Sequence, residues 1–539
     1  MNQSPLILSV SGARGIVGES MTPEVASRFA GAFAAVAKES SGRDEPLIIL
    51  GRDTRPSGEP LAQAVAQGLV RAGCRVIDLG IVMTPTVGVK VQQKRAAGGM
   101  VITASHNPAP WNGLKCLNRH GAAPAPAVAK RIIELFHSRG TDSQSVHGAA
   151  GTTSITNNAS ANDVHLDRVL RALGEESTNH IRAARFRVVL DSINGAGCVP
   201  GRMLLESLGC KVIQLNGEPD GTFAHAPEPI EENLRDICRA VKRERAHLGF
   251  AQDPDGDRLA IVDEQGAYIG EEYTLALCAL RALKRSAHSL APGSTRLSST
   301  VSSPRPELGT KADEASSPKS AGVSRHSPET ARDIVLAANL STSRMIDDVA
   351  SMFPQLGARV IRTAVGEANV VDALLAADNQ GAQALIGGEG NGGVIYPEVC
   401  WVRDSLISMA LVLDLLASRG VPAPGITRSS ETSLSIVVSS LPRYTMIKRK
   451  FDLSALGGTE SIAPMLAKVK AEFSNRSKHP DARINDTDGI RIDFADGWVH
   501  LRPSNTEPIV RLIAEAPSKE ACDALISQTQ RCCSPPLAT

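Results

Sequence analysis

The chain has 539 residues, too many for one compact domain, and at roughly 150 residues per domain it predicts three or four. Lysine and arginine number 58 and aspartate and glutamate 57, so the net charge of +1 excludes the basic excess of a dedicated nucleic-acid-binding protein. Hydrophobic residues make up 42% and aromatic residues 3%, which predicts aliphatic, alanine-rich cores of the α/β kind.

Short apolar runs alternate with amphipathic stretches through much of the chain, and this pattern predicts βα units. The first unit has a strand at 47–51, a helix at 60–73 and a strand at 74–80. The same pattern recurs at 186–216 and again at 333–366. These three copies predict three similar α/β domains in tandem.

Three stretches are typical of joints between such domains. Residues 139–163 and 418–433 are rich in small and polar residues, so we expect two domain linkers there. Residues 286–330 are rich in serine and poor in large apolar residues. Because such a segment cannot bury enough apolar surface to offset its ordering entropy, we expect it to be disordered or a mobile loop.

The C-terminal part has a different pattern. Alternating strings at 434–441, 490–504 and 509–516 predict strands that pair around Asp-Gly turns, with helices near 461–475 and 518–530. This pattern predicts a smaller, antiparallel α+β domain. The expected domains are therefore 1–150, 163–265, 266–417 with the serine-rich insertion, and 430–534.

A first polar loop, TASHNPAPWNGLK at 103–115, follows a predicted strand. It places Ser105 beside His106, with Lys115 ten residues further on, so a hydroxyl nucleophile, a candidate base and a cation can converge. On this loop alone, Ser105 and Asn107 could equally cap a turn.

A second loop, at 251–264, carries Asp253, Asp255 and Asp257 behind an apolar run. Alternate residues of an extended segment point to one side, so the three carboxylates can bracket one hard cation. Mg²⁺ is favoured because phosphate can complete its shell, and Arg258 can bind that phosphate from the other side. The alternative is an aspartate-rich turn without a ligand.

Two further loops complete the set of candidate sites. Glu389 and Asn391 lie among five glycines, and a carboxylate with an amide suits sugar hydroxyls, although a glycine-rich turn needs no ligand. The loop at 502–512 has the composition of a phosphate cradle, with an exposed charged hairpin as the alternative. Its candidate residues are Arg502, Ser504, Asn505, Thr506 and Arg511.

The N-terminal part adds arginines in two glycine-containing segments. Arg14 stands between glycines, and we favour a functional role for it. Arg52, Asp53 and Arg55 are more typical of an internal ion-pair network than of direct ligands. Ten scattered cysteines without a CxxC pair, no apolar run long enough to span a membrane and no export signal lead us to expect a cytoplasmic protein.

With TASHNP, DPDGDR, GGEGNGG and RPSNTEP in this order, the chain resembles the α-D-phosphohexomutase family, and most closely its bacterial and archaeal phosphoglucosamine mutase-like branch. The resemblance covers nearly the whole chain except the serine-rich stretch. It implies a four-domain fold, with three similar α/β domains and a smaller C-terminal α+β domain around a central cleft.

The resemblance also implies roles for the loop residues. Ser105 is similar to the serine that is phosphorylated in the active enzyme, and it would bind Mg²⁺ together with the three aspartates. Glu389 would hold sugar hydroxyls, and the loop from Arg502 to Arg511 would anchor the non-reacting phosphate. Residues near the transferred phosphoryl group would be Arg14, His106 and Lys115. Asn391 departs from the family, since many members carry serine there.

The implied reaction interconverts hexose 6-phosphate and hexose 1-phosphate through a phosphoserine and a 1,6-bisphosphate, which also serves as activator. We expect glucosamine phosphate as the substrate, with mannose or glucose phosphate as the alternative. A phosphoserine-dependent sugar phosphatase and a non-catalytic sugar-phosphate-binding protein are further alternatives. The expected partner is a small sugar phosphate, not nucleic acid or membrane, and the expected state is a monomer or homodimer.

Overall fold

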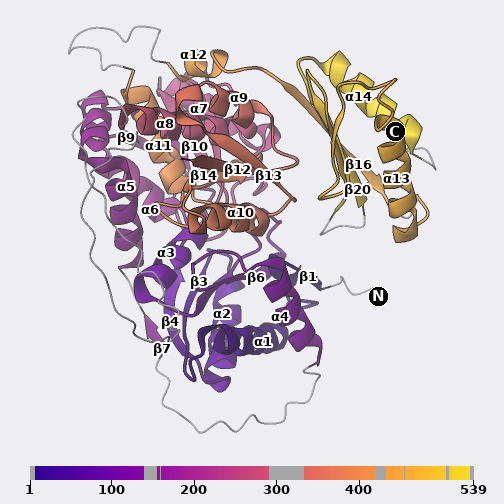
Figure 1. Ribbon diagram of the computed structural model, residues 1–539. Coiled ribbons are helices and arrows are strands. Elements are labelled where there is room, and N and C mark those ends of the chain that lie inside the picture. Colours follow the sequence, from indigo (N-terminus) through magenta and orange to yellow (C-terminus); the bar gives the residue numbers. More distant parts are fainter. Residues whose placement is uncertain are drawn as a thin grey trace, which may run out of the picture.

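The computed structural model describes residues 6–138, 155–157, 160–289, 333–419, 433–453, 456–504 and 509–533. These residues form four β-sheets with helices packed around them (Figure 1). The first three sheets contain parallel strands, and the last is wholly antiparallel. The expected α/β class, with a smaller α+β part at the C-terminus, is confirmed.

The first sheet has seven strands in the order β1-β2-β6-β5-β3-β4-β7. Neighbouring residues of β3 face opposite cores: Ile48 and Leu50 pack with α1, α2 and α4, and Ile49 packs on the side of α3. The elements are β1 (Ile7–Ser9), β2 (Gly12–Ile16), α1 (Pro23–Ser41), β3 (Leu47–Arg52), α2 (Gly58–Arg71), β4 (Arg75–Ile81), α3 (Thr84–Lys94), β5 (Gly98–Ile102), β6 (Trp111–Leu117), α4 (Pro126–Ser138) and β7 (Ile155–Asn157).

The second and third sheets have four strands each, in the orders β11-β10-β8-β9 and β13-β12-β14-β15. The second unit contains α5 (Ala161–Ala184), β8 (Arg187–Asp191), α6 (Cys198–Ser207), β9 (Lys211–Leu215), α7 (Arg235–Arg243), β10 (Leu248–Gln252) and β11 (Leu259–Val262). The third contains α8 (Glu272–Ser289), β12 (Ile334–Asn339), α9 (Met345–Ser351), β13 (Arg359–Thr363), α10 (Glu367–Asn379), β14 (Gln383–Glu389), β15 (Gly393–Ile395) and α11 (Ser405–Ala417).

One strand arrangement occurs in all three of these sheets. The first and second strands of the unit are parallel, the third lies on the other side of the first, and the chain then turns back into an antiparallel neighbour. The returning pairs are β5 with β6, β10 with β11, and β14 with β15. The loops that carry Ser105, the three aspartates and Asn391 are these three equivalent turns, at the carboxyl ends of parallel strands where open α/β sheets bind ligands.

Helix α11 lies at the centre of the largest core. Every residue of α11 is buried, which agrees with a sequence that is apolar around the whole helix. Asp404, directly before it, caps the helix and lies 2.9 Å from His165 Nε2, whose other ring nitrogen lies 3.0 Å from the hydroxyl of Thr86. These three residues connect the three α/β units. Neither α11 nor any other helix in the described ranges is long and apolar enough to cross a membrane.

The C-terminal sheet stands to one side of the others, at the upper right of Figure 1, and has its own core. Its strand order is β16-β20-β19-β18-β17. Two helices cover it. The elements are β16 (Thr445–Asp452), α13 (Ile462–Phe473), β17 (Arg483–Asn485), β18 (Ile490–Asp493), β19 (Trp498–Pro503), β20 (Ile509–Ala516) and α14 (Lys519–Cys532).

The predicted strand at 434–441 is wrong. This segment forms helix α12 (Leu434–Ser439), and Leu434 and Val437 are buried in the large core of the α/β units. Its run of β-branched residues favours a strand, but burial at i and i+3 against that core selects the helix. One edge strand of the C-terminal sheet is instead β16, which the sequence analysis missed.

The predicted linkers fall largely outside the described residues. Within 139–163 the structure describes β7, which pairs in parallel with β4, and the start of α5. Of the serine-rich stretch it describes only 286–289, at the end of α8.

Candidate active site

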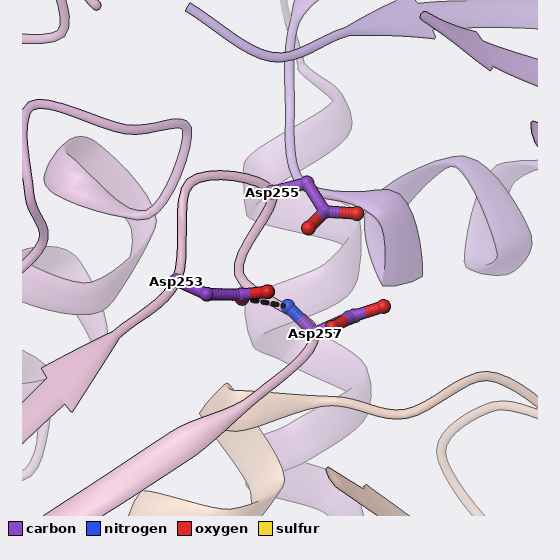
Figure 2. A group of neighbouring side chains, drawn as sticks. All are labelled: Asp253, Asp255 and Asp257. Atoms are coloured by element: carbon purple, nitrogen blue, oxygen red, sulfur yellow. Dashed lines mark hydrogen bonds between the residues drawn. The ribbon is translucent and has the colours of Figure 1, made fainter. Parts of the chain in front are cut away.

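Three aspartates in the turn between β10 and β11 form a buried cluster (Figure 2). Asp253, Asp255 and Asp257 are fully buried, and one oxygen of each lies within 4.8 Å of the others. Gly256, with φ of +67°, makes the turn, and a Cβ there would lie 2.5 Å from Met83. The Oδ1 atoms of Asp255 and Asp257 have no hydrogen-bond partner among the described residues. Such a group can hold one divalent cation.

Ser105 lies directly against this cluster. Its Oγ donates a 3.2 Å hydrogen bond to Asp253 Oδ2 and lies 3.4 Å from His106 Nδ1. The φ of Ser105 is +52°, a left-handed conformation that a non-glycine residue keeps only when its surroundings hold it. The structure therefore brings the serine of the first loop to the aspartates of the second.

Arg55 holds the backbone of the serine loop. Its Nη2 donates 2.7 Å hydrogen bonds to the carbonyl oxygens of both Ser105 and Asn107. Its Nε lies 3.1 Å from Asp53 Oδ2, and both charged groups are buried. Arg55 and Asp53 thus form the expected internal ion pair, and that pair supports the strained backbone of Ser105.

Lys115 supplies a cation inside the aspartate cluster. Its Nζ lies 2.6 Å from Asp255 Oδ2 and 2.8 Å from Asp257 Oδ2. Burial lowers the pKa of this ammonium, but the two carboxylates outweigh burial and raise the pKa above its ordinary value. Burial and the other two aspartates raise the pKa of Asp253 well above its usual range. Burial also disfavours the charge of Asp257, but Arg403, Lys115 and Arg258 outweigh it and lower the pKa of that carboxyl. The surrounding cations therefore offset burial at Asp257 and not at Asp253.

Cations also surround His106. Arg258 is the main cause that lowers the pKa of His106 to about 2, followed by burial and Arg14. Burial lowers the pKa of Arg14 itself, and its Nη1 donates a 3.2 Å hydrogen bond to Asn107 Oδ1. Arg258 Nε is 3.9 Å from Asp257 Oδ1. Two arginines near one neutral imidazole form a place where an anion would be stabilised.

Glu389 is tied to its neighbours on both carboxylate oxygens. Oε1 accepts a 2.9 Å hydrogen bond from Asn339, and Oε2 accepts a 2.8 Å hydrogen bond from Arg403. Asn391 lies 3.5 Å from Glu389 Oε2 and accepts a hydrogen bond from the N–H of Gly393. The side chain of Asn391 therefore contacts its own loop.

A row of cations crosses three strands of the C-terminal sheet. Arg502 on β19 lies opposite Arg511 on β20, and Arg511 lies opposite Lys450 on β16. Arg502 is 7% exposed, its Nε has no hydrogen-bond partner among the described residues, and burial lowers its pKa. Like charges directly opposite one another are unfavourable, so this row favours a bound anion.

The rest of the predicted phosphate cradle is described only in part. The N–H of Ser504 donates a 2.8 Å hydrogen bond to the carbonyl of Ile509, which closes the base of the turn. Asn505 and Thr506 lie outside the described residues.

Four domain models of one family match successive parts of the chain. Phosphoglucomutase/phosphomannomutase alpha/beta/alpha domains I, II and III match residues 6–142, 164–266 and 321–434, and the C-terminal domain matches 460–529. The chain belongs to the phosphoglucomutase/phosphomannomutase family. The resemblance to the α-D-phosphohexomutases is confirmed, and with it the prediction of an isomerase-type enzyme.

Two curated members of the family match over nearly their whole length. A phosphoglucomutase/phosphomannomutase from Thermococcus kodakarensis is 35% identical over 515 residues, which cover 94% of each chain. A phosphoglucosamine/phosphogalactosamine mutase from Sulfurisphaera tokodaii is 28% identical over 526 residues, which cover 97% of this chain and 98% of that protein.

Solved structures of the phosphoglucomutase/phosphomannomutase family share the fold. A family protein from Burkholderia thailandensis superposes with a TM-score of 0.71 at 22% identity, covering 98% of this chain and 97% of that one. The open form of the Paramecium phosphoglucomutase parafusin gives a TM-score of 0.69 at 15% identity, covering 98% and 94%.

The sequence analysis missed three residues of the site. Arg403 contacts both Asp257 and Glu389. Glu367 contacts Arg403, and Asn339 contacts Glu389. None of them belongs to the four loop motifs. The available signal was the charged pair Arg403 and Asp404 directly before an apolar run long enough for a buried helix.

Proposed function

We propose that the chain interconverts hexose 6-phosphate and hexose 1-phosphate through a phosphorylated Ser105. The observation that carries this proposal is the 3.2 Å contact between Ser105 Oγ and Asp253 in the buried aspartate cluster. A hydroxyl that contacts a cation site and is held in a strained backbone conformation is suited to carrying a phosphoryl group.

The aspartate cluster fits Mg²⁺. All three donors are hard oxygens, and two of them, Asp255 Oδ1 and Asp257 Oδ1, have no hydrogen-bond partner among the described residues. When bound there, Mg²⁺ would offset the negative charge of the transferred phosphoryl oxygens. Asp253, Asp255 and Asp257 would hold it together with Ser105.

The side chains around Ser105 suit the transfer. The bond from Ser105 Oγ to phosphorus breaks as the sugar hydroxyl oxygen forms the new bond to phosphorus. The proton that the sugar hydroxyl loses balances the proton that Ser105 Oγ takes up. Arg14 and Arg258 would contact the phosphoryl group, and a bound anion would offset their effect on the pKa of His106. His106, 3.4 Å from Ser105 Oγ, is then placed to exchange a proton with that atom.

The two ends of the substrate would occupy different domains. Glu389 would bind sugar hydroxyls, while Arg502, Arg511 and the turn between them would bind the phosphate that does not react. The 1,6-bisphosphate formed in the first transfer must turn over, so that its second phosphate reaches Ser105. Added 1,6-bisphosphate would then act as an activator because it phosphorylates Ser105.

The experiment follows the interconversion of glucosamine, mannose and glucose 6-phosphates by phosphorus NMR, with Mg²⁺ and a trace of the matching 1,6-bisphosphate. We propose glucosamine phosphate as the fastest substrate, supported by the name of the relative from Sulfurisphaera tokodaii. A preference for mannose or glucose phosphate would follow the name of the relative from Thermococcus kodakarensis. Release of inorganic phosphate without isomerisation, or full activity of Ser105→Ala, would contradict the proposal.

A further inference from the structure

Arg403 connects two loops that have separate parts in the proposed reaction. Its Nη2 lies 2.7 Å from Asp257 Oδ2 in the aspartate cluster, and its Nη1 donates a 2.8 Å hydrogen bond to Glu389 Oε2 in the sugar loop. A guanidinium is a rigid planar fork, so these two bonds set the position of one carboxylate relative to the other.

The backbone and the Nε atom of Arg403 are also held in place. The N–H of Arg403 donates a 2.9 Å hydrogen bond to Glu367 Oε1, and its Nε lies 3.5 Å from Glu367 Oε2. The next residue, Asp404, caps α11 and contacts His165. The side chain of Arg403 is 8% exposed, so solvent has little access to its ion pairs.

Gly393 leaves the space through which Arg403 reaches Asp257 and Glu389. A Cβ added at Gly393 would lie 2.2 Å from Arg403 Cδ, closer than two non-bonded carbon atoms can approach. The backbone of Gly393, in strand β15, does not itself require glycine, because its φ is not positive. Glycine is therefore needed at this position because a side chain would occupy the space that the arginine side chain fills.

We propose that Arg403 is a positioning residue that couples sugar binding at Glu389 to divalent-cation binding at Asp257. The identity of the two ligands rests on the proposed function. A cation at the aspartate cluster would bind the same carboxylate, that of Asp257, that holds Nη2 of Arg403. The bond from Nη1 transmits any resulting shift of the guanidinium to Glu389, and by thermodynamic linkage a bound sugar phosphate affects the cation equally.

The test compares wild-type protein with Arg403→Met, Arg403→Lys and Gly393→Ala. Calorimetry gives the Kd of hexose 1-phosphate with and without Mg²⁺, and kinetics give KM and kcat. In Arg403→Met and Gly393→Ala we expect KM to rise about tenfold or more, and the effect of Mg²⁺ on the sugar phosphate Kd to fall several-fold. Arg403→Lys keeps the charge but not the fork, so we expect it to restore cation affinity to near wild type without restoring KM.

Gly393→Ala retains every charged group, and it keeps the test decisive if Arg403→Met folds poorly. In an Arg403→Ala background the added methyl group meets no arginine and only Asn391 Oδ1 at 3.1 Å, so Gly393→Ala should cause a much smaller further loss. Arg359→Met, which removes an exposed ion pair with Asp333, is the control. Wild-type KM and wild-type coupling in both Arg403→Met and Gly393→Ala would overturn the inference.

Binding of Mg²⁺ alone separates this inference from the proposed function. Arg403→Met removes a cation 2.7 Å from Asp257, so we expect the Kd of Mg²⁺ to fall about threefold or more. If wild-type protein neither binds nor converts hexose phosphates, the proposed function fails, and the Mg²⁺ affinity then decides whether Arg403 acts on the cation site. An unchanged Mg²⁺ affinity in that case would overturn the inference as well.

Discussion

Arg55 donates a 2.7 Å hydrogen bond to the backbone carbonyl of Ser105, the residue that contacts the aspartate cluster through its side chain. The same guanidinium nitrogen also donates to the carbonyl of Asn107, so one buried arginine holds the backbone on both sides of His106. The orientation of the hydroxyl thus depends on a residue from another loop, between β3 and α2.

Arg55→Met should therefore lower kcat about tenfold or more, because the left-handed backbone at Ser105 relaxes without its anchor. It should also cost about 3 kcal/mol of stability, since Asp53 stays buried without its partner. Steady-state kinetics and urea unfolding check the two effects, and mass spectrometry after incubation with 1,6-bisphosphate gives the phosphorylated fraction of Ser105. Arg52→Met is the control, because Arg52 pairs with exposed Glu59 at 3.6 Å; equal losses in the two variants would contradict the anchoring role.

Lys115→Met should make the stability of the protein depend more strongly on Mg²⁺. Without the ammonium, Asp255 and Asp257 lose a cation at 2.6 and 2.8 Å, and unfolding in EDTA should become easier by about 3 kcal/mol or more. Mg²⁺ should then raise the Tm of the variant by more than it raises that of wild type. Lys519→Met, which removes an exposed pair with Asp523, should leave the Mg²⁺ effect unchanged. Equal Mg²⁺ shifts in wild type and Lys115→Met would count against a shared site.

His106 should contribute to acid sensitivity of the fold. Its pKa is about 2 in the folded protein and about 6.5 when unfolded, so between these values the unfolded state binds more protons. Stability from this residue is complete above about pH 6.5 and is lost as the pH falls. In urea unfolding, the His106→Gln variant should therefore lose less stability than wild type when the pH falls from 7 to 4.

The sequence predicts those parts of the site whose chemistry is contiguous along the chain. Asp253, Asp255 and Asp257 lie within five residues, and Ser105 lies beside His106, so residue type and spacing suffice to single them out. The structure places the serine and the aspartates together, and their roles remain predictions. Three repeats of one βα pattern likewise predict the α/β units, because hydrophobic periodicity is local.

Contacts that depend on packing between units could not be predicted. Arg403 reaches Asp257 across 146 positions of sequence. The charged pair Arg403 and Asp404 before an apolar run signals a buried charge, but it does not identify the aspartate loop as the partner of Arg403. The cation row depends on strand register, which pairs Lys450 on β16 with Arg511. Consecutive charged residues in β16 interrupt the alternation of apolar and polar residues by which a strand is predicted. For α12 a strand was predicted and a helix is found, since burial in a distant core overrode a local preference for strand.

Arg502→Gln should weaken substrate binding without weakening the ligand-free fold. Arg502 lies opposite Arg511 across β19 and β20 and also interacts with Asp488, so removing its charge loses one attraction and relieves one repulsion, while a phosphate dianion loses a charged donor. KM for hexose phosphate should rise about tenfold to a hundredfold, with a smaller change in kcat, because the non-reacting phosphate is bound similarly in ground and transition states. Inorganic phosphate should raise the Tm of wild type and have less effect on Arg502→Gln.

Lys470→Gln provides the matched control, since Lys470 pairs with Asp486 on the exposed surface of the same domain at 2.6 Å. This variant should keep both the KM and the phosphate-dependent Tm of wild type. If Arg502→Gln keeps them too, the cation row does not bind the substrate's phosphate. If instead Arg502→Gln lowers kcat with no change in KM, then the phosphate contact forms only during transfer, and the C-terminal domain acts on the reacting end of the sugar.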